Sequence, residues 1–442
     1  MGKSIFKNNG IGRTTILLIS CVCFSFVSTT HAQEEDYYND SYVRYENRIY
    51  KDVIQSVWLG KPGSDFQQHI LSLNILETLV LKFDDMDADI KNYRYKLIHC
   101  TYDWKPSNLH ESDYVGGFNN EQIYDYKFSF NTLVPYTHYS LQIPNEYMRP
   151  LISGNYLLFV FIDNENQPAI TRRFCVSDNK IIVSGRVHRA TDLSIRSSHQ
   201  EVDFSIITNE LEIANPFEDL KIVLQQNDRW DNTLYNLKPL FIRDKELDYN
   251  HDDINNFPGG NEFRRFDSRT TRYAREGVSH IRYSDNATEF VLNTDQSLAY
   301  KKYTFENDIN GRRKIENIEG IDPDTESDYV NVHFVLKYPI PVTEGTVYVF
   351  GELTDWRLLP EARMKYNEED KYYHCPLLLK QGYYNYQYVV LKDGEKAIDL
   401  SLTEGNHFES TNQYTLYVYY RPPGSRYDHL VGIQMLFADG TQ

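Results

Sequence analysis

Alternation of apolar and polar residues with a period of two is the main pattern along the chain. It is clearest from Val202 to Ile206 and from Val330 to Leu336, where every second residue is apolar. Residues 155–162 instead form a nearly continuous apolar run of strand length. Alternation is typical of half-buried strands, and short apolar runs are typical of strands buried on both faces. No stretch keeps a helical period over three turns, so the pattern predicts an all-β protein.

Breaks in the strand pattern divide the chain into segments. Polar residues interrupt it at Ser177-Asp178-Asn179, and Pro339 and Pro341 mark a second break. A long polar stretch over residues 244–275 predicts loops between strands. We therefore predict three consecutive immunoglobulin-like β-sandwich domains followed by a C-terminal tail. The predicted domains cover residues 51–178, 179–340 and 341–422, and the tail covers residues 423–442.

The N-terminus carries the features of a signal peptide. Three basic residues precede a short apolar run over residues 16–27, and Thr30-His31-Ala32 supplies the small residues of a cleavage site. The run is too short for a spanning helix, so we expect export without a membrane anchor. Residues 1–32 are the predicted signal peptide, and the acidic, Tyr-rich residues 33–50 are a predicted flexible lead-in. Lipoprotein processing at Cys21 is the alternative to cleavage after Ala32.

Composition narrows the choice of function. The 442 residues carry 46 Lys and Arg against 63 Asp and Glu, a formal net charge of −17. Hydrophobic residues make up 41% and charged residues 25%, which excludes a disordered chain. The acidic balance argues against a protein that binds nucleic-acid backbones through a basic face. The 36 Tyr and 23 Phe, against 5 Met, favour strands and agree with the alternation pattern.

Cysteine usage gives no disulfide framework. Removal of the predicted signal peptide leaves Cys100, Cys175 and Cys375, an odd and small number. The main interpretation is that all three are buried small hydrophobes. A disulfide between Cys100 and Cys175 is the alternative in an oxidising compartment. The spacings typical of structural zinc sites are absent.

Candidate catalytic and metal-binding residues are few. Asp84, Asp85, Asp87 and Asp89 cluster after a predicted strand, where a solvated loop is the main interpretation and calcium ligation the alternative. Glu262, close to two glycines, is one acid in a distinctive context, with loop structure or partner contact favoured over catalysis. HExxH and Gly-x-Ser-x-Gly motifs are absent. The sequence therefore predicts no enzyme, no catalytic residue, no metal and no cofactor.

A motif near the C-terminus resembles a sugar-binding module. Gly351-Glu352-Leu353-Thr354-Asp355-Trp356 and the strand at residues 379–386 are similar to early-set β-sandwich modules that bind glycogen and starch. The resemblance implies an early-set sandwich over residues 341–422. In a binding role Trp356 stacks on a sugar face or a partner surface, and in the alternative role it packs inside the sandwich. This motif supports an alternative function, an envelope carbohydrate-binding protein.

A longer ordered set of motifs spans the first two predicted domains. The motifs include His99-Cys100, Tyr136-Thr137-His138-Tyr139, Ser153-Gly154-Asn155-Tyr156, Arg229-Trp230-Asp231-Asn232, Gly260-Asn261-Glu262-Phe263-Arg264 and Asp328-Tyr329-Val330. No single motif is specific, but their collinear order over about 360 residues resembles the plug protein family of the Bacteroidota type IX secretion system. Thr101-Tyr102 departs from the family pattern at the end of a strand.

The resemblance implies a non-enzymatic stopper in the periplasm. Its implied partner is the giant outer-membrane β-barrel translocon, through which it associates with the outer membrane without inserting into it. Neither nucleic acid nor a cofactor is implied, and a glycan is a ligand only under the alternative function. Because Arg, Trp and Tyr are common in binding hot spots, the predicted partner contacts are Arg229, Trp230, Asn261, Glu262 and Arg264, with Trp356 added from the C-terminal motif. Packing between domains is the alternative for the first five.

Overall fold

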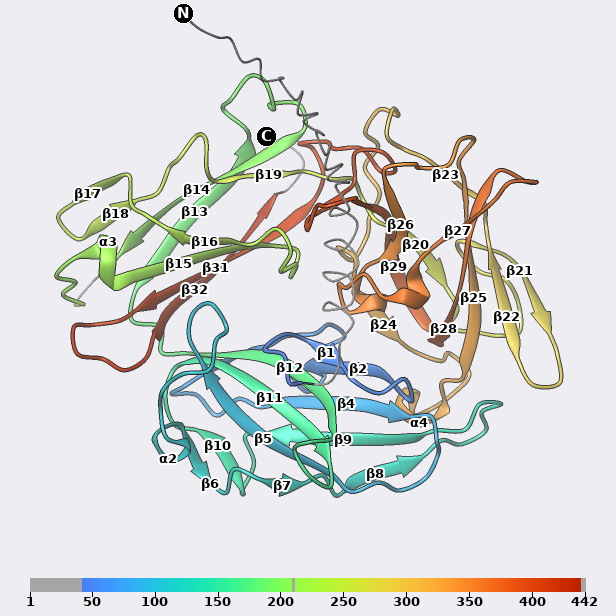
Figure 1. The fold of residues 1–442 in the computed structure, drawn as a ribbon, viewed down its shortest axis with the longest axis horizontal. Coiled ribbons are helices and arrows are strands. Elements are labelled where there is room, and N and C mark those ends of the chain that lie inside the picture. The colour runs from blue at the N-terminus through green and yellow to red at the C-terminus, as the bar shows by residue number, and fades with distance from the viewer. Residues whose placement is uncertain (1–41, 209–210, 439–442) are drawn as a thin grey trace, which may run out of the picture. The chain divides into compact units, whose positions relative to one another are not determined.

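The computed structural model describes residues 42–208 and 211–438 (Figure 1). All of them lie in one compact unit, Asp40–Gln442. The predicted signal peptide, the Cys21 alternative and the first part of the lead-in lie outside the described residues. The described helices are short, namely α2 (Glu111–Tyr114), α3 (Pro216–Asp219), α4 (Pro323–Glu326) and two 3₁₀ turns at Glu352–Thr354 and Pro360–Ala362. None of the described helices could cross a membrane. The chain is therefore mostly β, as predicted.

The first region, residues 42–178, holds two larger sheets and a two-stranded one. One sheet runs β1 (Arg48–Ile49), β12 (Pro168–Ser177), β11 (Gly154–Ile162), β5 (Tyr93–Cys100) and β7 (Glu121–Gln122), with β3 (Ile70–Ser72) parallel to β12. The other runs β2 (Ile54–Gly60), β4 (Leu79–Asp85), β9 (Thr137–Ile143) and β8 (Asp125–Phe128). β6 (Val115–Gly117) pairs with β10 (Met148–Pro150). Apolar residues of both larger sheets share one core, and β11 is buried on both faces, which explains its continuous apolar run.

Residues 42–50 differ from the predicted flexible lead-in. β1 pairs with β12, and the Arg48 side chain is buried. The Thr171 hydroxyl donates to the Glu46 carbonyl at 2.7 Å, and the Arg173 amide donates to Asn47 Oδ1 at 2.8 Å. The polar composition of this segment predicted solvent exposure, but its backbone completes the edge of a sheet.

The second region combines residues 179–258 with residues 411–438. One sheet contains β13 (Ile182–Arg189), β14 (His199–Ile207), β18 (Glu246–Asp248) and β17 (Phe241–Arg243), with β19 (Asn256–Pro258) also paired to β14. The other contains β16 (Leu234–Leu237), β15 (Leu220–Gln226), β31 (Asn412–Tyr420) and β32 (His429–Ala438). The two sheets share a second hydrophobic core.

Residues 259–410, here called the inserted region, form a third core between two further sets of strands. β29 (Gly382–Lys392) pairs with β20 (Arg264–Asp267), β24 (Arg313–Ile315), β26 (Gly345–Phe350) and β30 (Ile398–Asp399). The other sheet runs β21 (Val278–Tyr283), β22 (Thr288–Leu292), β25 (Tyr329–Lys337), β28 (Tyr372–Lys380) and β27 (Lys365–Asn367), with β23 (Asp295–Gln296) beside β25. β22 and β23 run parallel to β25, and the other pairs are antiparallel.

Strand pairing does not follow the predicted linear division at residues 340–341. β20 lies before that boundary and β29 after it, yet they pair from Arg264 to Asp267. β31 and β32 belong with β15, although residues 341–422 were expected to form their own domain and residues 423–442 a tail. The reason is that β31 is buried along its whole length and needs a partner on both edges, which β15 and β32 supply.

Candidate docking surface and buried joints

The sequence-predicted contacts Arg229 and Trp230 lie at a junction between regions. The Arg229 guanidinium pairs with both carboxylate oxygens of Asp231 at 3.0 and 2.7 Å. The Trp230 ring meets Trp104 of the first region edge to face, with centroids 5.5 Å apart. The Arg173 guanidinium lies 4.5 Å from the Trp230 ring centroid. Both predicted residues are buried or half-buried, so the described contacts correspond to the packing alternative.

Asn261, Glu262 and Arg264 also make contacts within the protein. Glu262 accepts from the Thr411 amide at 3.0 Å and from the Thr411 hydroxyl at 2.7 Å, across the junction of the inserted and second regions. The Arg264 guanidinium binds Glu404 through two hydrogen bonds at 3.0 and 2.9 Å. The Asn261 amide donates to the Glu404 carbonyl at 2.9 Å. The structure brings these three residues together in hydrogen bonds that hold the start of β20 against Glu404 and Thr411.

Trp356 lies at the side of a small aromatic cluster. Its ring is half-buried and meets Phe350 and Phe263 edge to face, with centroids 5.7 and 6.1 Å apart. An added Cβ on Gly311 would lie 2.3 Å from the Trp356 ring, so the backbone also approaches it closely. These contacts match the internal-packing alternative stated for Trp356.

A buried ionic network joins the first region to the inserted region. Lys380 Nζ lies 2.6 Å from Asp84 Oδ2, and the two side chains are only 2% and 1% exposed. Asp84 also accepts from the Tyr329 hydroxyl at 2.7 Å and lies 2.7 Å from His138 Nδ1. Burial alone would raise the pKa of the Asp84 carboxyl, but Lys380 and His138 lower that pKa below its ordinary value. Asp84 is therefore a buried partner in a joint and not a solvated loop acid.

A second set of buried charges lies along the same junction. Arg172 of β12 is 2% exposed and pairs with Asp355 at 2.6 Å. Arg313 of β24 lies 3.6 Å from Glu352 and donates to the Val57 carbonyl at 2.9 Å. Removing one member of such a pair leaves an uncompensated buried charge. The two sets of pairs therefore favour one relative orientation of the first and inserted regions.

The junction between the first and second regions is mainly apolar. Cys100, Cys175 and Trp104 of the first region share a buried cluster with Val223, Tyr417, Tyr419 and Leu430 of the second. Asn155 lies among them, where its Oδ1 accepts from the Tyr419 hydroxyl at 2.7 Å. The junction thus combines apolar packing with a satisfied buried amide.

All three described cysteines are free and buried. Cys100 and Cys175 both lie opposite Asn155, one on each strand flanking β11. Two strand spacings separate their Cα atoms by about 10 Å, whereas a disulfide requires less than about 7 Å. Burial raises the pKa of both thiols to about 12. The disulfide alternative is therefore wrong for this fold, and the buried-hydrophobe interpretation is confirmed.

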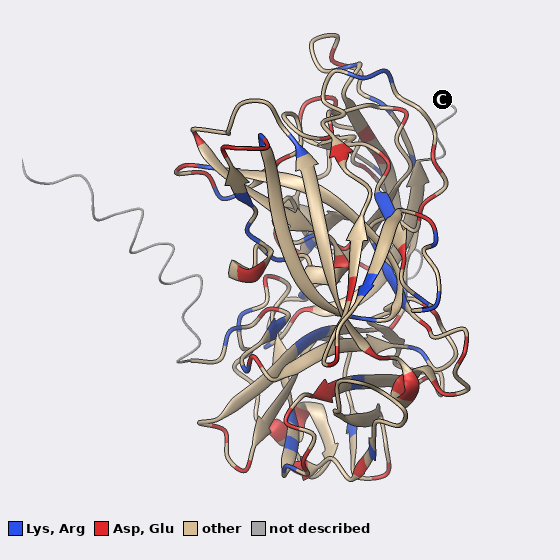
Figure 2. Ribbon diagram, turned by 90° about the vertical axis from the view of Figure 1, so that its right-hand side faces the viewer, with Lys and Arg blue, Asp and Glu red and all other residues tan. Residues whose placement is uncertain are grey.

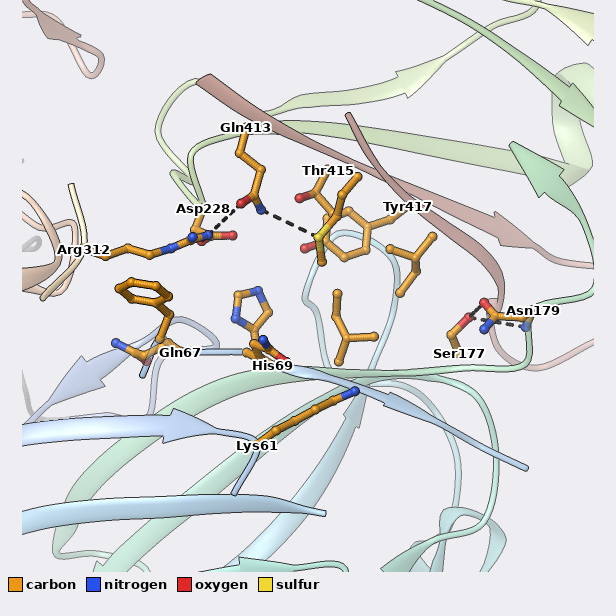
Figure 3. Close-up of a pocket in the computed structure, with 15 residues that line it drawn as sticks. Lys61, Gln67, His69, Ser177, Asn179, Asp228, Arg312, Gln413, Thr415 and Tyr417 are labelled. Carbon is orange, nitrogen blue, oxygen red and sulfur yellow. Dashed lines mark hydrogen bonds and ion pairs between the residues drawn. The ribbon is translucent and has the colours of Figure 1, made fainter. Parts of the chain in front are cut away.

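A pocket of about 340 Å³ opens where the three regions meet (Figure 3). Lys61, Gln67 and His69 line it from the first region, facing Asp228 and Gln413 of the second. Arg312 of the inserted region reaches across and bonds Asp228 at 3.0 Å and Gln413 at 2.8 Å. The best-placed polar groups are therefore already paired with one another, and the pocket presents no converging set that identifies a ligand.

The predicted calcium alternative does not fit the acidic loop. Asp85, Asp87 and Asp89 lie close together, but the Lys91 ammonium sits among them at 2.7, 2.5 and 3.4 Å. Burial alone would lower the pKa of Lys91, but hydrogen bonds to Asp85 and Asp87 raise it above its ordinary value. A cation from the chain itself thus neutralises these carboxylates.

Exposed aromatic side chains gather on one side of the first region. The set defined here as the aromatic edge has 37–74% of each side chain exposed and comprises Phe118, Tyr124, Tyr126, Phe128, Phe130 and Tyr147. β6, β7 and β10 lie on the side turned away from the other two regions (Figure 1). The end of β8 instead reaches the inserted region, where Lys127 Nζ lies 3.3 Å from Asp322 Oδ2 and the Phe130 amide donates to the Thr325 carbonyl at 2.9 Å. The Phe118 amide bonds the Tyr147 carbonyl at 3.0 Å, and the Tyr126 and Phe128 rings lie 6.0 Å apart. Exposed apolar patches of this kind mark interaction surfaces.

Charged residues of both signs are spread over the molecule and do not gather on one side as these aromatics do (Figure 2). Lys and Arg are interspersed with Asp and Glu along strands and loops in the view of Figure 2.

Sequence reasoning missed the aromatic edge because alternation in Asp125–Phe128 predicts that Tyr126 and Phe128 face a core. All four residues of β8 are exposed instead, because β8 is the last strand of its sheet. The signal that could have found it is the density of aromatics between residues 118 and 130.

The strands and surfaces define a mainly β protein of several antiparallel sheets, with a candidate docking surface in its first region. Residues 54–178 match the family described as "Type 9 secretion system plug protein 1st domain". Residues 54–178 therefore belong to the type 9 secretion system plug protein family, and the resemblance seen in the sequence is confirmed there.

A solved structure extends the likeness beyond the family match. The crystal structure of a hypothetical protein from Parabacteroides merdae ATCC 43184 is 33% identical in sequence, with a TM-score of 0.86. The alignment covers 90% of this chain and 100% of that one. The C-terminal domain of the Streptococcus pyogenes antigen I/II-family protein AspA is 10% identical, over 87% of this chain and 99% of that one. The TM-score of that match is 0.15, below the range that indicates a shared fold. No curated protein matches the chain.

Proposed function

We propose that the protein is a non-enzymatic periplasmic plug that seals the periplasmic end of the outer-membrane translocon barrel of type IX secretion. The observation that carries the proposal is the family match over residues 54–178. The family implies association with the translocon and a structural role without chemistry. Export through the predicted signal peptide and association with the outer membrane through the barrel complete the proposal.

The aromatic edge supports the proposal and is its docking surface. Its members lie within residues 54–178, the segment that carries the family match. A stopper needs an outward surface that binds a barrel wall, and exposed Phe and Tyr are efficient anchors because they bury a large area with little loss of side-chain freedom. The six contacts predicted from sequence are half-buried or buried and remain predictions as partner contacts.

A stopper also needs a fixed shape, which the buried joints support. Lys380 with Asp84, and Arg172 with Asp355, link the first and inserted regions through charges shielded from water. No described observation favours the carbohydrate-binding alternative, because the Trp356 ring packs against Phe263 and Phe350.

The test is recovery of the tagged protein from detergent-solubilised native envelopes, with partners identified by mass spectrometry. We expect a single very large β-barrel in near-equal amount. Phe128→Asp should reduce this recovery at least tenfold, since it places a charge in a surface that must lose its water. Phe241→Asp is the matched control. Phe241 on β17 is 55% exposed and Phe128 on β8 is 54% exposed, and both strands end their sheets.

If the wild-type protein is recovered without the barrel, although the barrel is intact and abundant in the envelopes, the plug proposal is refuted. Equal loss of the barrel in both variants would instead refute the aromatic edge as the docking surface. The two failures are distinguishable because the first concerns the wild type and the second only the variants.

A further inference from the structure

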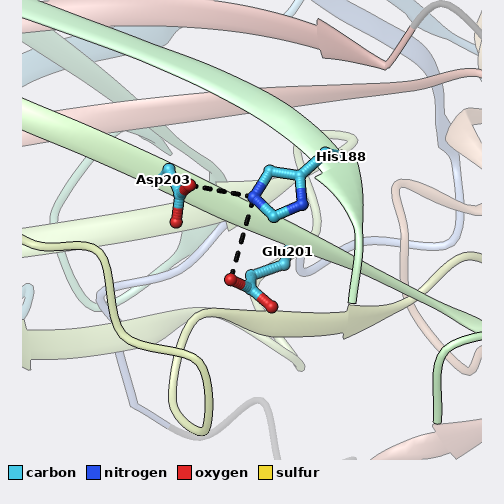
Figure 4. A group of neighbouring side chains, drawn as sticks. All are labelled: His188, Glu201 and Asp203. Carbon is cyan, nitrogen blue, oxygen red and sulfur yellow. Dashed lines mark hydrogen bonds and ion pairs between the residues drawn. The ribbon is translucent and has the colours of Figure 1, made fainter. Parts of the chain in front are cut away.

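The β13–β14 hairpin gathers three metal-ligating side chains that no sequence motif connects. His188 of β13 pairs directly with Glu201 of β14, and Arg186 pairs with Asp203. Glu201 and Asp203 are two residues apart, so they lie on the same face of the strand. Val202 and Phe204 of the same strand enter the hydrophobic core, which places the group on the opposite face of the sheet. Figure 4 shows the imidazole turned toward both carboxylates.

The spacing of the donor atoms fits a single ion. His188 Nε2 lies 2.9 Å from Asp203 Oδ2 and 3.7 Å from Glu201 Oε1, and the ligand atoms of all three residues lie within 4.8 Å of one another. Donor atoms bound tetrahedrally to zinc at about 2.0–2.1 Å are separated by about 3.3 Å. The two histidine distances lie on either side of that value, so small rotamer shifts would close the site around an ion.

The orientation of His188 is that of a metal ligand. Its Nδ1 lies 2.9 Å from the Arg189 backbone carbonyl. A carbonyl oxygen only accepts, so Nδ1 carries the proton and donates. The other ring nitrogen, Nε2, is the one turned toward the two carboxylates. Donation of the second ring N–H to a backbone carbonyl is the arrangement that usually fixes metal-bound histidine.

The carboxylates need a cation that the neighbouring side chains supply only in part. Glu201 is 1% exposed, and it accepts from the Thr191 amide at 2.7 Å and the Thr191 hydroxyl at 3.2 Å, which are neutral donors. Arg186 reaches Asp203 at 2.9 Å, but its side chain is 71% exposed. Two adjacent carboxylates, one of them almost fully buried, are costly unless a positive charge lies between them, either a protonated His188 or a bound cation.

We propose that His188, Glu201 and Asp203 bind a divalent transition-metal ion of the zinc type. One nitrogen and two carboxylate oxygens suit Zn²⁺ and balance its charge. The ion clips β13 to β14 and thereby stabilises the second region, a property beyond the plug role. The sequence predicted no metal because the ligands are 13 and 2 residues apart, and only the hairpin register brings them together.

The test is Zn²⁺ titration of the full-length mature protein after EDTA treatment, by calorimetry and by thermal unfolding. We expect binding of one ion, a rise in Tm that EDTA reverses, and visible absorption when Co²⁺ replaces Zn²⁺. His188→Gln and Glu201→Gln should each weaken binding at least a hundredfold, more than loss of an outer partner would. Asp87→Asn, in the cluster filled by Lys91, should leave binding unchanged.

Arg186→Gln keeps the test decisive if a ligand variant fails to fold. Arg186 competes with the ion for Asp203 and is mostly exposed, so its removal should tighten Zn²⁺ binding several-fold. Absence of saturable binding to the wild type, binding that survives His188→Gln, or weaker binding in Arg186→Gln would each overturn the proposal.

Discussion

Lys380→Met tests the buried joint between the first and inserted regions most directly. Methionine keeps much of the side-chain volume but removes the charge that lies 2.6 Å from Asp84. Asp84 then keeps only His138 and Tyr329 as partners in an almost water-free site. We expect the free energy of unfolding to fall by about 3–5 kcal/mol, the range for breaking one half of a buried ion pair.

The geometry of the pair supports this magnitude. Two unit charges 2.6 Å apart attract by about 6 kcal/mol at an effective dielectric constant of 20. The net loss on substitution is smaller than this attraction, because the intact pair also bears the cost of removing the ammonium from water. Unfolding of about 400 residues as one unit changes the entropy by about 0.8 kcal/mol/K, so a loss of 4 kcal/mol lowers Tm by about 5 °C.

Lys82→Met is the matched control. Lys82 Nζ lies at the same distance, 2.6 Å, from Asp324 Oδ2 and bridges the same two regions, but these side chains are 34% and 32% exposed. An exposed pair contributes at most about 1 kcal/mol. Urea unfolding followed by tryptophan fluorescence measures both variants. Equal losses in the two variants, or a loss below about 1 kcal/mol for Lys380→Met at an unchanged m-value, would refute the reasoning from burial.

The pH dependence of the same joint has a defined sign. The folded pKa of Asp84 lies below its ordinary value, so the pair contributes its full stability above the unfolded carboxyl pKa of about 3.9. That contribution is lost as the pH falls further, through the folded pKa.

The double variant Asp84→Asn with Lys380→Met should lose less stability than Lys380→Met alone, because no unpaired charge stays buried.

Three further predictions concern burial elsewhere. Burial lowers the pKa of His99 to about 4. The free energy of unfolding should therefore fall by up to about 3 kcal/mol between pH 7 and pH 4, because over most of this range only the unfolded histidine takes up a proton. Urea unfolding at each pH measures this dependence, and His99→Phe should reduce it. Gly311→Ala should cost about 1–3 kcal/mol more than Gly63→Ala, because both glycines have φ of +76° but only the first faces the Trp356 ring; similar costs would contradict the clash. The three buried thiols should resist a thiol reagent at pH 8 in the folded protein and react in urea.

Local sequence patterns were sufficient to predict individual strands but not to predict which strands pair with one another. The alternation at Val202–Ile206 and the apolar run at residues 155–162 correctly predicted β14 and β11, because side-chain burial on one or both faces is a property of a single strand. The pairing of β15 with β31 joins residues that are 188 to 200 positions apart, from Gln226 with Tyr414 to Leu220 with Tyr420. No local signal encodes such a pair, so the prediction divided the inserted region between two consecutive domains, 179–340 and 341–422.

The candidate sites were predictable only to the same extent, because residue type is read from the sequence but exposure depends on the fold. Arg229, Glu262 and Arg264 were predicted as partner contacts because their residue types suit interfaces, and such types suit buried joints inside one chain equally well. The exposure that separates the two roles depends on neighbouring strands. The aromatic edge and the His188 group became visible only once the sheet ends and the hairpin register were fixed.

The insertion itself favours the rigidity that the proposed plug requires. A domain attached in series has one covalent link and can rotate about it, whereas the inserted region leaves β19 and returns to β31 by two links. Two links restrict rotation, and buried pairs such as Arg172 with Asp355 penalise the rotation that is left, because separating them exposes unpaired charges to a dry interface. Covalent topology and buried charge thus act on the same motion. A barrel seal that must not yield under load needs that motion suppressed, and a module that only binds a soluble sugar does not.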